Sequence, residues 1–141
     1  MFNPSRDQAR QFLIDAWAKH RNRLPGTAME ALAADLVALH PEYHALLEAE
    51  DALTREWTPE QGETNPFLHL SLHLAIEEQL SIDQPPGIRT AFTLLQSRRA
   101  DRHEALHDVL ECLGEMLWRA QTSGLPPDGE AYIDCVRRKA G

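Results

Sequence analysis

Cysteine is scarce in this chain of 141 residues, which contains only Cys112 and Cys135. The two form no Cys-x-x-Cys pair and are too few for the disulfide framework of a small secreted domain. We therefore expect both to be small buried residues of a reduced protein, for which a cytoplasmic location fits best.

Positive charge is also scarce, because the chain has 14 Lys and Arg residues but 22 Asp and Glu residues, which gives a formal net charge of -8. Nucleic acids and anionic membranes are bound by basic patches, so this balance argues against both as partners. No apolar run approaches the roughly 20 residues of a membrane span. The start Met1–Arg6 lacks the pattern of a signal peptide. The sequence leaves a homodimer and a protein partner open.

The chain lacks any run of alternating polar and apolar residues that would predict a strand. Apolar residues instead recur at helical spacing. With 43% apolar and 26% charged residues, the composition is that of a globular protein long enough to bury a core. We therefore predict an all-α protein, with one helical domain over residues 1–141 built as a bundle of five to six helices.

Capping patterns and prolines place the expected helices along the chain. Thr27 and Glu30 form a capping-box pattern, and Pro41 interrupts the helix that follows. Residues 51–64 read as a loop, with Trp57 and Pro59 folded back onto the body of the protein. The expected helices run from about Pro4 to Arg23, from Thr27 to the break at Pro41, from Asn65 to Ile82, from Pro85, from Asp101 to Gln121 and from Asp128 to Lys139.

The chain repeats the pattern His-x-x-x-His-x-x-x-Glu three times, which uses six of the seven histidines. A spacing of four places side chains on one face of a helix. The three rows are His40, His44 and Glu48; His69, His73 and Glu77; and His103, His107 and Glu111.

Imidazole and carboxylate together suit a divalent transition metal, and zinc or iron are the leading candidates. Each row rises about 12 Å along its helix, so one ion cannot reach both ends. The rows therefore predict one or two metal ions in a histidine- and glutamate-lined core. Antiparallel helices would make two His-His-Glu sites about one turn apart, whereas parallel helices would pair like positions. The sequence leaves both arrangements open.

The helical wheel ranks the three rows. The His69 row runs down the middle of an apolar face, where buried imidazole is costly unless it is bonded to something. The His103 row lies at the edge of such a face. The His40 row is the weakest because Pro41 prevents a regular helix through it, and His40 is then a candidate cap of the following helix.

Two other interpretations of the histidines stay open. They could be structural residues of a non-catalytic interaction module. Alternatively, residues 103–107 match the zinc-peptidase string H-E-x-x-H, in which Glu104 would be the catalytic base. That string is short, and Asp108 follows it where zinc peptidases usually carry an apolar residue.

Several stretches resemble a small bacterial family known only as domain of unknown function eighteen forty-one. They are the start Met1–Gln8, the stretch His40–His44, the central stretch Asn65–Gln79, Asp83–Gly87 and Cys112–Glu115. The resemblance covers nearly the whole chain and implies a bacterial cytosolic protein, but it implies no activity. The functional prediction therefore rests on the histidines. They predict a metal-binding protein, as a metal-dependent oxidoreductase or hydrolase or as a non-catalytic module, and the catalytic residues are not identified.

Overall fold

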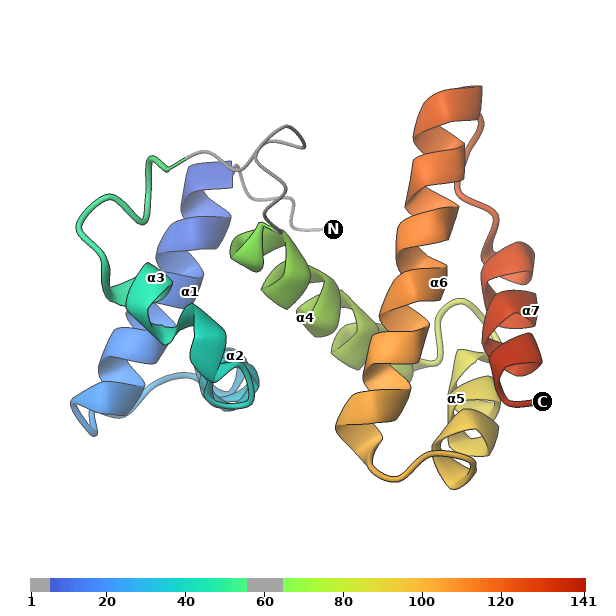
Figure 1. Ribbon diagram of the computed structural model, residues 1–141, viewed down its shortest axis with the longest axis horizontal. Helices are drawn as coiled ribbons and strands as arrows, with labels where there is room; N and C mark the ends of the chain where they lie inside the picture. The colour runs from blue at the N-terminus through green and yellow to red at the C-terminus, as the bar shows by residue number, and fades with distance from the viewer. Residues whose placement is uncertain (1–5, 56–64) are drawn as a thin grey trace. The chain divides into compact units, whose positions relative to one another are not determined.

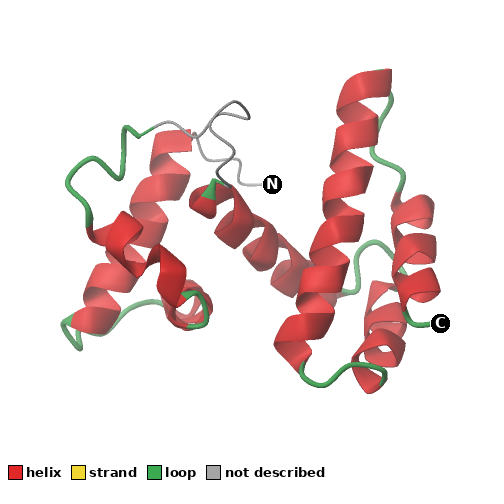
Figure 2. Cartoon of the chain, in the orientation of Figure 1, coloured by secondary structure: helices red, strands yellow, loops and turns green. Residues whose placement is uncertain are grey.

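The computed structural model describes residues 6–55 and 65–141, and this part of the chain consists of helices and loops (Figure 2). The all-α prediction is confirmed, but the helix count is higher than the predicted five to six. The elements are α1 (Arg6–Arg21), α2 (Ala28–Ala38), the 3-10 helix η1 (Pro41–Tyr43), α3 (His44–Glu48), α4 (Pro66–Ile82), α5 (Ile88–Ser97), α6 (Arg102–Ser123) and α7 (Gly129–Lys139). The predictions for Pro4, Trp57 and Pro59 lie outside the described residues.

The additional helix results from the break at Pro41. Proline lacks a backbone N–H and its ring clashes with the preceding turn, so α2 ends at Ala38 and the chain restarts as η1 and α3. The predicted start of α2 is confirmed, because the side chains of Thr27 and Glu30 form the reciprocal capping box. One interrupted helix in the sequence is therefore two helices in the structure.

The chain divides into two compact units, and the first extends from Met1 to Leu74. In this unit α1 packs against α2 and α3 (Figure 1). The core residues include Leu13, Trp17, Leu36, Val37, Leu47, Phe67 and Leu70. The buried Arg10 lies over the ring of Phe67 and donates to the backbone carbonyl oxygens of Ala52, Leu53 and Arg55. The segment after α3 is thereby held to α1.

The second unit extends from Ala75 to Gly141, and in it α7 packs against both α5 and α6. Its buried residues include Ile88, Leu95, Val109, Leu113, Tyr132 and Val136. The hydroxyl of Tyr132 donates to Oε1 of Gln79 at 2.6 Å, which links α7 to the last turns of α4. Helix α4 contributes residues to both units. That the chain acts as one domain stays a prediction from the sequence.

Capping residues explain where the later helices begin. The side-chain oxygens of Asn65, Asp101 and Asp128 accept backbone N–H bonds from the first turns of α4, α6 and α7, as predicted. Helix α5 differs, because it begins at Ile88 after Gly87 rather than at Pro85. Gly87 has a φ of 98°, a conformation that glycine adopts without steric cost.

The two cysteines form a disulfide between α6 and α7, whereas their number and spacing had predicted free thiols. Cys112 is buried, as expected, whereas Cys135 is only half-buried, and their Cα atoms lie 5.8 Å apart. That separation is within disulfide range and results from helix packing, which the sequence separation of 23 does not reveal. The expectation of reduced cysteines was therefore wrong, and the argument for a cytoplasmic location loses its basis.

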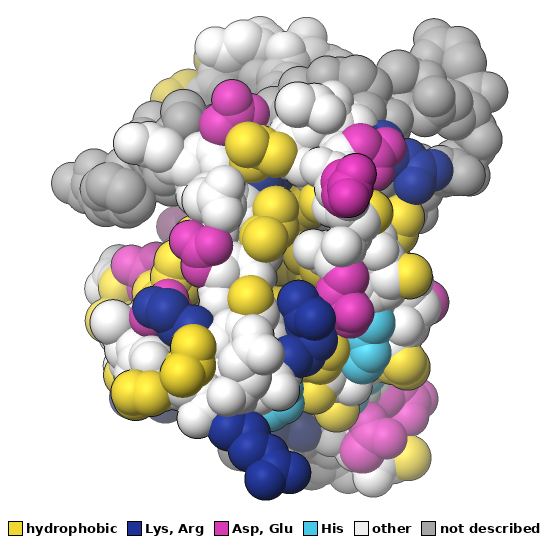
Figure 3. Space-filling view, turned by 90° about the vertical axis from the view of Figure 1, so that its left-hand side faces the viewer, with side chains coloured by type: hydrophobic (Ala, Val, Ile, Leu, Met, Phe, Trp, Pro, Cys, Tyr) yellow, Lys and Arg dark blue, Asp and Glu magenta, His cyan; other side chains and the backbone are white. Residues whose placement is uncertain are grey.

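None of the helices in residues 6–55 and 65–141 is long and apolar enough to cross a membrane. On the face drawn in Figure 3, basic and acidic side chains are interspersed rather than gathered into a patch of one sign. This distribution fits the composition, in which acidic residues outnumber basic ones without forming long runs.

We expect reduction of the Cys112–Cys135 disulfide to lower the free energy of unfolding by about 3–4 kcal/mol, because the bond restricts a loop of this size in the unfolded chain. Denaturant titrations with and without a dithiol reductant measure the difference. The double variant Cys112→Ser/Cys135→Ser is the control and should not respond to the reductant. Two free thiols in the unfolded, unreduced protein would contradict the disulfide.

Candidate metal site

His69 and His73 lie one turn apart on α4, with ring centroids 4.8 Å apart. Their Nε2 atoms are separated by 3.2 Å. The His73 side chain is fully buried and that of His69 is half-buried, in agreement with the predicted position of this row on an apolar face. The regular helix therefore brings two imidazole nitrogens to one point, as the spacing of four requires.

His40 reaches the same point from the end of α2. Its ring is buried, and Nδ1 lies 2.7 Å from the backbone carbonyl oxygen of Leu36. A carbonyl oxygen only accepts hydrogen bonds, so Nδ1 carries the proton and Nε2 of a neutral ring presents its lone pair. This Nε2 atom lies 3.1 Å from Nε2 of His69.

The structure also corrects the expected role of His40. Its backbone occupies the N-cap position of η1, but its side chain makes no capping hydrogen bond. The ring turns back towards α2 instead, because Pro41 ends the helix and releases the backbone of His40 from helical geometry. The proline that weakened the predicted row therefore frees His40 to approach His69.

The Nε2 atom of His69 lies at the spacing of metal ligands from the Nε2 atoms of His40 and His73. Nitrogens bound at about 2.0–2.1 Å to a tetrahedral zinc ion lie about 3.3 Å apart, close to the observed 3.1 and 3.2 Å. In neutral rings the Nε2 atom of His69 carries either a proton or a lone pair, so it cannot donate to His40 and accept from His73 at once. A cation bound beside His69 would accept a lone pair from each of these nitrogens.

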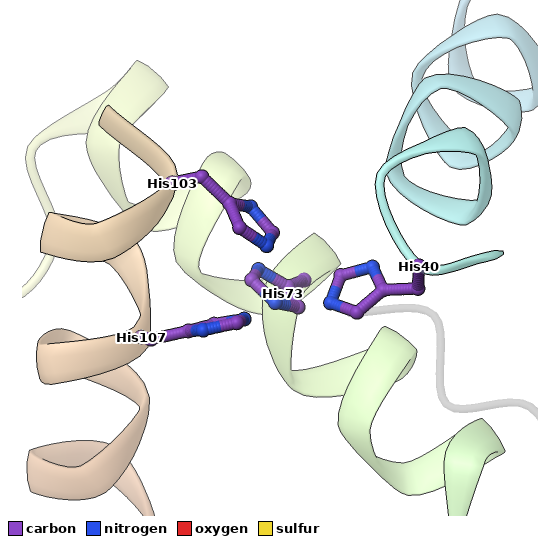
Figure 4. Close-up of side chains that lie close together, drawn as sticks. All are labelled: His40, His73, His103 and His107. Carbon is purple, nitrogen blue, oxygen red and sulfur yellow. The ribbon is translucent and has the colours of Figure 1, made fainter. Parts of the chain in front are cut away.

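Two further histidines lie on α6, where His103 and His107 are half-buried and their ring centroids are 4.2 Å apart. Figure 4 shows both rings extending from the same face of this helix. His103 and His107 belong to the second unit, and their spacing of four on a regular helix is that of a pair of metal ligands. Each compact unit therefore contains histidines that could bind a metal ion.

The glutamates of the three rows contact other groups. Both carboxylate oxygens of Glu77 accept hydrogen bonds from Arg102, at 2.7 and 3.0 Å. Glu111 is exposed and forms an ion pair with Lys139 at 2.7 Å. These cations are 25 and 28 residues away in the sequence, so the pairs depend on helix packing.

Glu48, in the first row, accepts a hydrogen bond from the indole nitrogen of Trp17 at 3.1 Å. His44 of the same row stacks on Trp17, with ring centroids 4.3 Å apart. The Nε2–H group of His44 donates to the backbone carbonyl oxygen of Val37 at 2.8 Å. Because that nitrogen already donates a hydrogen bond to a carbonyl oxygen, His44 supports the packing of α1, α2 and α3.

The peptidase string on α6 has its glutamate in solvent. Glu104 is exposed, and its backbone N–H donates to the N-cap residue Asp101 at 2.8 Å. The part of the chain that the structure describes contains no strand to which a peptide could add. The histidines of the string form a pair on α6, but the structural context expected of a zinc peptidase is not present in the described residues.

Tyr43 is a residue at the site that the sequence analysis missed. Its ring is parallel to that of His40, with centroids 5.4 Å apart, and edge-on to that of His69 at 5.8 Å. Burial raises the pKa of the Tyr43 hydroxyl, and the nearby charge of Glu42 raises it further, so the phenol stays protonated at neutral pH. Its position depends on the turn at η1, which sequence periodicity does not describe.

A family model described as "Domain of unknown function (DUF1841)" matches residues 5–138. The match covers almost the whole chain, so the protein belongs to this family. No curated protein and no solved structure matches the chain. The family description names no activity, and the functional argument therefore rests on the geometry of the histidines.

We expect Glu77→Gln to lower the free energy of unfolding by about 1 kcal/mol, because it removes the charge from a partly exposed, bidentate ion pair with Arg102. Metal affinity should change by much less than the tenfold or more that follows loss of a ligand. Denaturant unfolding and a Zn²⁺ competition titration measure the two effects. A loss of affinity as large as that of His73→Gln would instead identify Glu77 as a ligand.

Proposed function

We propose that this member of the family binds a divalent transition metal ion through histidine side chains, with zinc and iron as the leading candidates. The observation that supports this most directly is the position of the His69 Nε2 atom, which lies 3.1 Å from that of His40 and 3.2 Å from that of His73, both buried residues. These distances suit the ligands of one ion, and a cation would accept the lone pairs of such nitrogens.

The proposed core ligands are His40, His69 and His73 of the first unit, and the proposed further ligands are His103 and His107 of the second. The further ligands are supported by their adjacent rings on α6, whose centroids lie 4.2 Å apart. An all-imidazole set suits zinc, iron, nickel or copper rather than magnesium or calcium, which prefer oxygen ligands. The predicted ligands Glu77 and Glu111 are left out because each forms an ion pair with a cation, and His44 is left out because its Nε2–H serves a carbonyl oxygen.

The number of metal ions is part of the proposal. A tetrahedral zinc ion takes four ligands, whereas the first unit offers three of the proposed histidines and the second offers two. An ion bound within one unit would therefore keep an open position. Measured stoichiometry separates the mononuclear from the dinuclear arrangement.

The role of the metal determines whether the protein is an enzyme. A site with an exchangeable coordination position would support a metal-dependent hydrolase or oxidoreductase, because water bound there is activated as a nucleophile or is replaced by substrate. A closed all-protein site would support the non-catalytic alternative. The bacterial origin and the cytoplasmic location stay predictions from the sequence. Because the cytoplasm keeps most thiols reduced, the oxidation state of Cys112 and Cys135 in cells tests the predicted location directly.

We expect tag-free protein to bind Zn²⁺ with a stoichiometry of one or two, and His73→Gln to weaken binding by at least about 100-fold, because loss of a ligand should exceed the cost of losing a supporting residue. Elemental analysis and competition with a chromophoric chelator measure both. Equal changes in His69→Gln and His40→Gln are expected.

The matched control is His20→Gln. His20 is the one histidine outside the three rows, is exposed, and stacks on Trp17 rather than on another imidazole. This variant should bind metal like the wild type. Absence of metal binding in the wild type, or equal binding by His20→Gln and His73→Gln, would reject the proposed site.

Replacement of the metal with Co²⁺ tests the role of the site. The visible absorption of Co²⁺ depends on its ligands, so an added anion such as azide changes the spectrum only when it enters the coordination shell. A spectral change would support an exchangeable position and hence catalysis, and an unchanged spectrum would support a closed, non-catalytic site.

A further inference from the structure

His40 has less support from its backbone than the other core ligands. His69 and His73 belong to the regular helix α4, which fixes their spacing. His40 instead lies between the end of α2 and η1, with φ of -124° and ψ of 67°. Its ring orientation therefore depends on contacts made by the ring itself.

Two of these contacts are made with residues other than the proposed ligands. The Nδ1–H group donates to the carbonyl oxygen of Leu36 at 2.7 Å, which selects the tautomer with its lone pair on Nε2. The ring of Tyr43 lies nearly parallel to the His40 ring and against its face, with 6° between the planes and 5.4 Å between the centroids. The hydrogen bond fixes one edge of the imidazole, and the aromatic face limits its rotation.

Tyr43 also contacts a second core ligand. Its ring meets that of His69 edge-on, with 72° between the planes and 5.8 Å between the centroids. The backbone N–H of Tyr43 donates to the carbonyl oxygen of His40 at 2.9 Å, which closes the turn that carries both residues. One side chain is therefore packed against the two rings whose Nε2 atoms are 3.1 Å apart.

We propose that Tyr43 is a positioning residue that holds the His40 ring in the orientation needed to bind metal beside His69. The aromatic ring rather than the hydroxyl group performs this role, because Tyr43 contacts His40 and His69 ring to ring. The inference rests on the proposed metal-binding function. Groups that orient metal-binding histidines commonly affect metal affinity by about 10- to 100-fold.

Three variants separate the ring from the hydroxyl group and from the local charge. Tyr43→Phe keeps the aromatic face, Tyr43→Leu keeps apolar volume without that face, and Glu42→Gln changes the exposed neighbour of Tyr43 as a matched control. Zn²⁺ competition titrations should give wild-type affinity for Tyr43→Phe and Glu42→Gln. Tyr43→Leu should bind about tenfold more weakly or worse.

A second measurement does not require metal. In ¹⁵N-histidine-labelled, metal-free protein, the ring nitrogen shifts report which nitrogen of His40 carries the proton. We expect one tautomer, with the proton on Nδ1, in the wild type and Tyr43→Phe, and averaged or broadened signals in Tyr43→Leu. Thermal unfolding of each variant identifies general loss of folding, which would alter the signals of His20 and His44 as well.

The results separate the inference from the function on which it rests. Wild-type affinity in Tyr43→Leu, or a loss in Tyr43→Phe equal to that in Tyr43→Leu, would overturn the positioning role of the ring. If the wild type bound no Zn²⁺, the proposed function would fail, and the His40 tautomer signals would still test Tyr43. An unchanged His40 tautomer in folded Tyr43→Leu would then overturn the inference.

Discussion

The close approach of imidazole rings from α4 and from the turn after α2 is the interaction on which the proposed site depends. The Nε2 atom of His69 lies 3.1 Å from that of His40 and 3.2 Å from that of His73, spacings that match ligands of one ion. The carbonyl oxygen of Leu36 accepts the Nδ1–H bond of His40, which leaves the lone pair of this ring on Nε2, the atom beside His69. The proposed metal ion would accept lone pairs from these nitrogens.

The pairing of the glutamates gives the proposed site its chemical character. Arg102 holds Glu77 with two hydrogen bonds, and Lys139 pairs with Glu111. A metal bound only by neutral imidazoles keeps its full positive charge, whereas carboxylate ligands would reduce it. Such an ion is a stronger Lewis acid and has more affinity for an added anion. These ion pairs therefore bear on what the proposed site could do.

Each compact unit is stabilised by different means. In the first, the side chains of α1, α2 and α3 surround an apolar core, and the buried Arg10 holds the segment after α3 through three carbonyl oxygens. In the second, α5, α6 and α7 pack together, and the disulfide adds a covalent bond between α6 and α7. Helix α4 supplies residues to both units, so the row His69, His73 and Glu77 extends from one unit into the other along a single helix.

The sequence alone determined the helical class, the capping boundaries at Thr27, Asn65, Asp101 and Asp128, and the burial of His73, because these features depend on local chemistry and a period of 3.6 residues. Tertiary structure decided the partners of Glu77 and Glu111, the disulfide, and the approach of His40 and Tyr43 to His69. Each of these depends on residues that are distant in the chain or on the turn that follows Pro41. Helical periodicity specifies a face of a helix, but only packing specifies what that face meets.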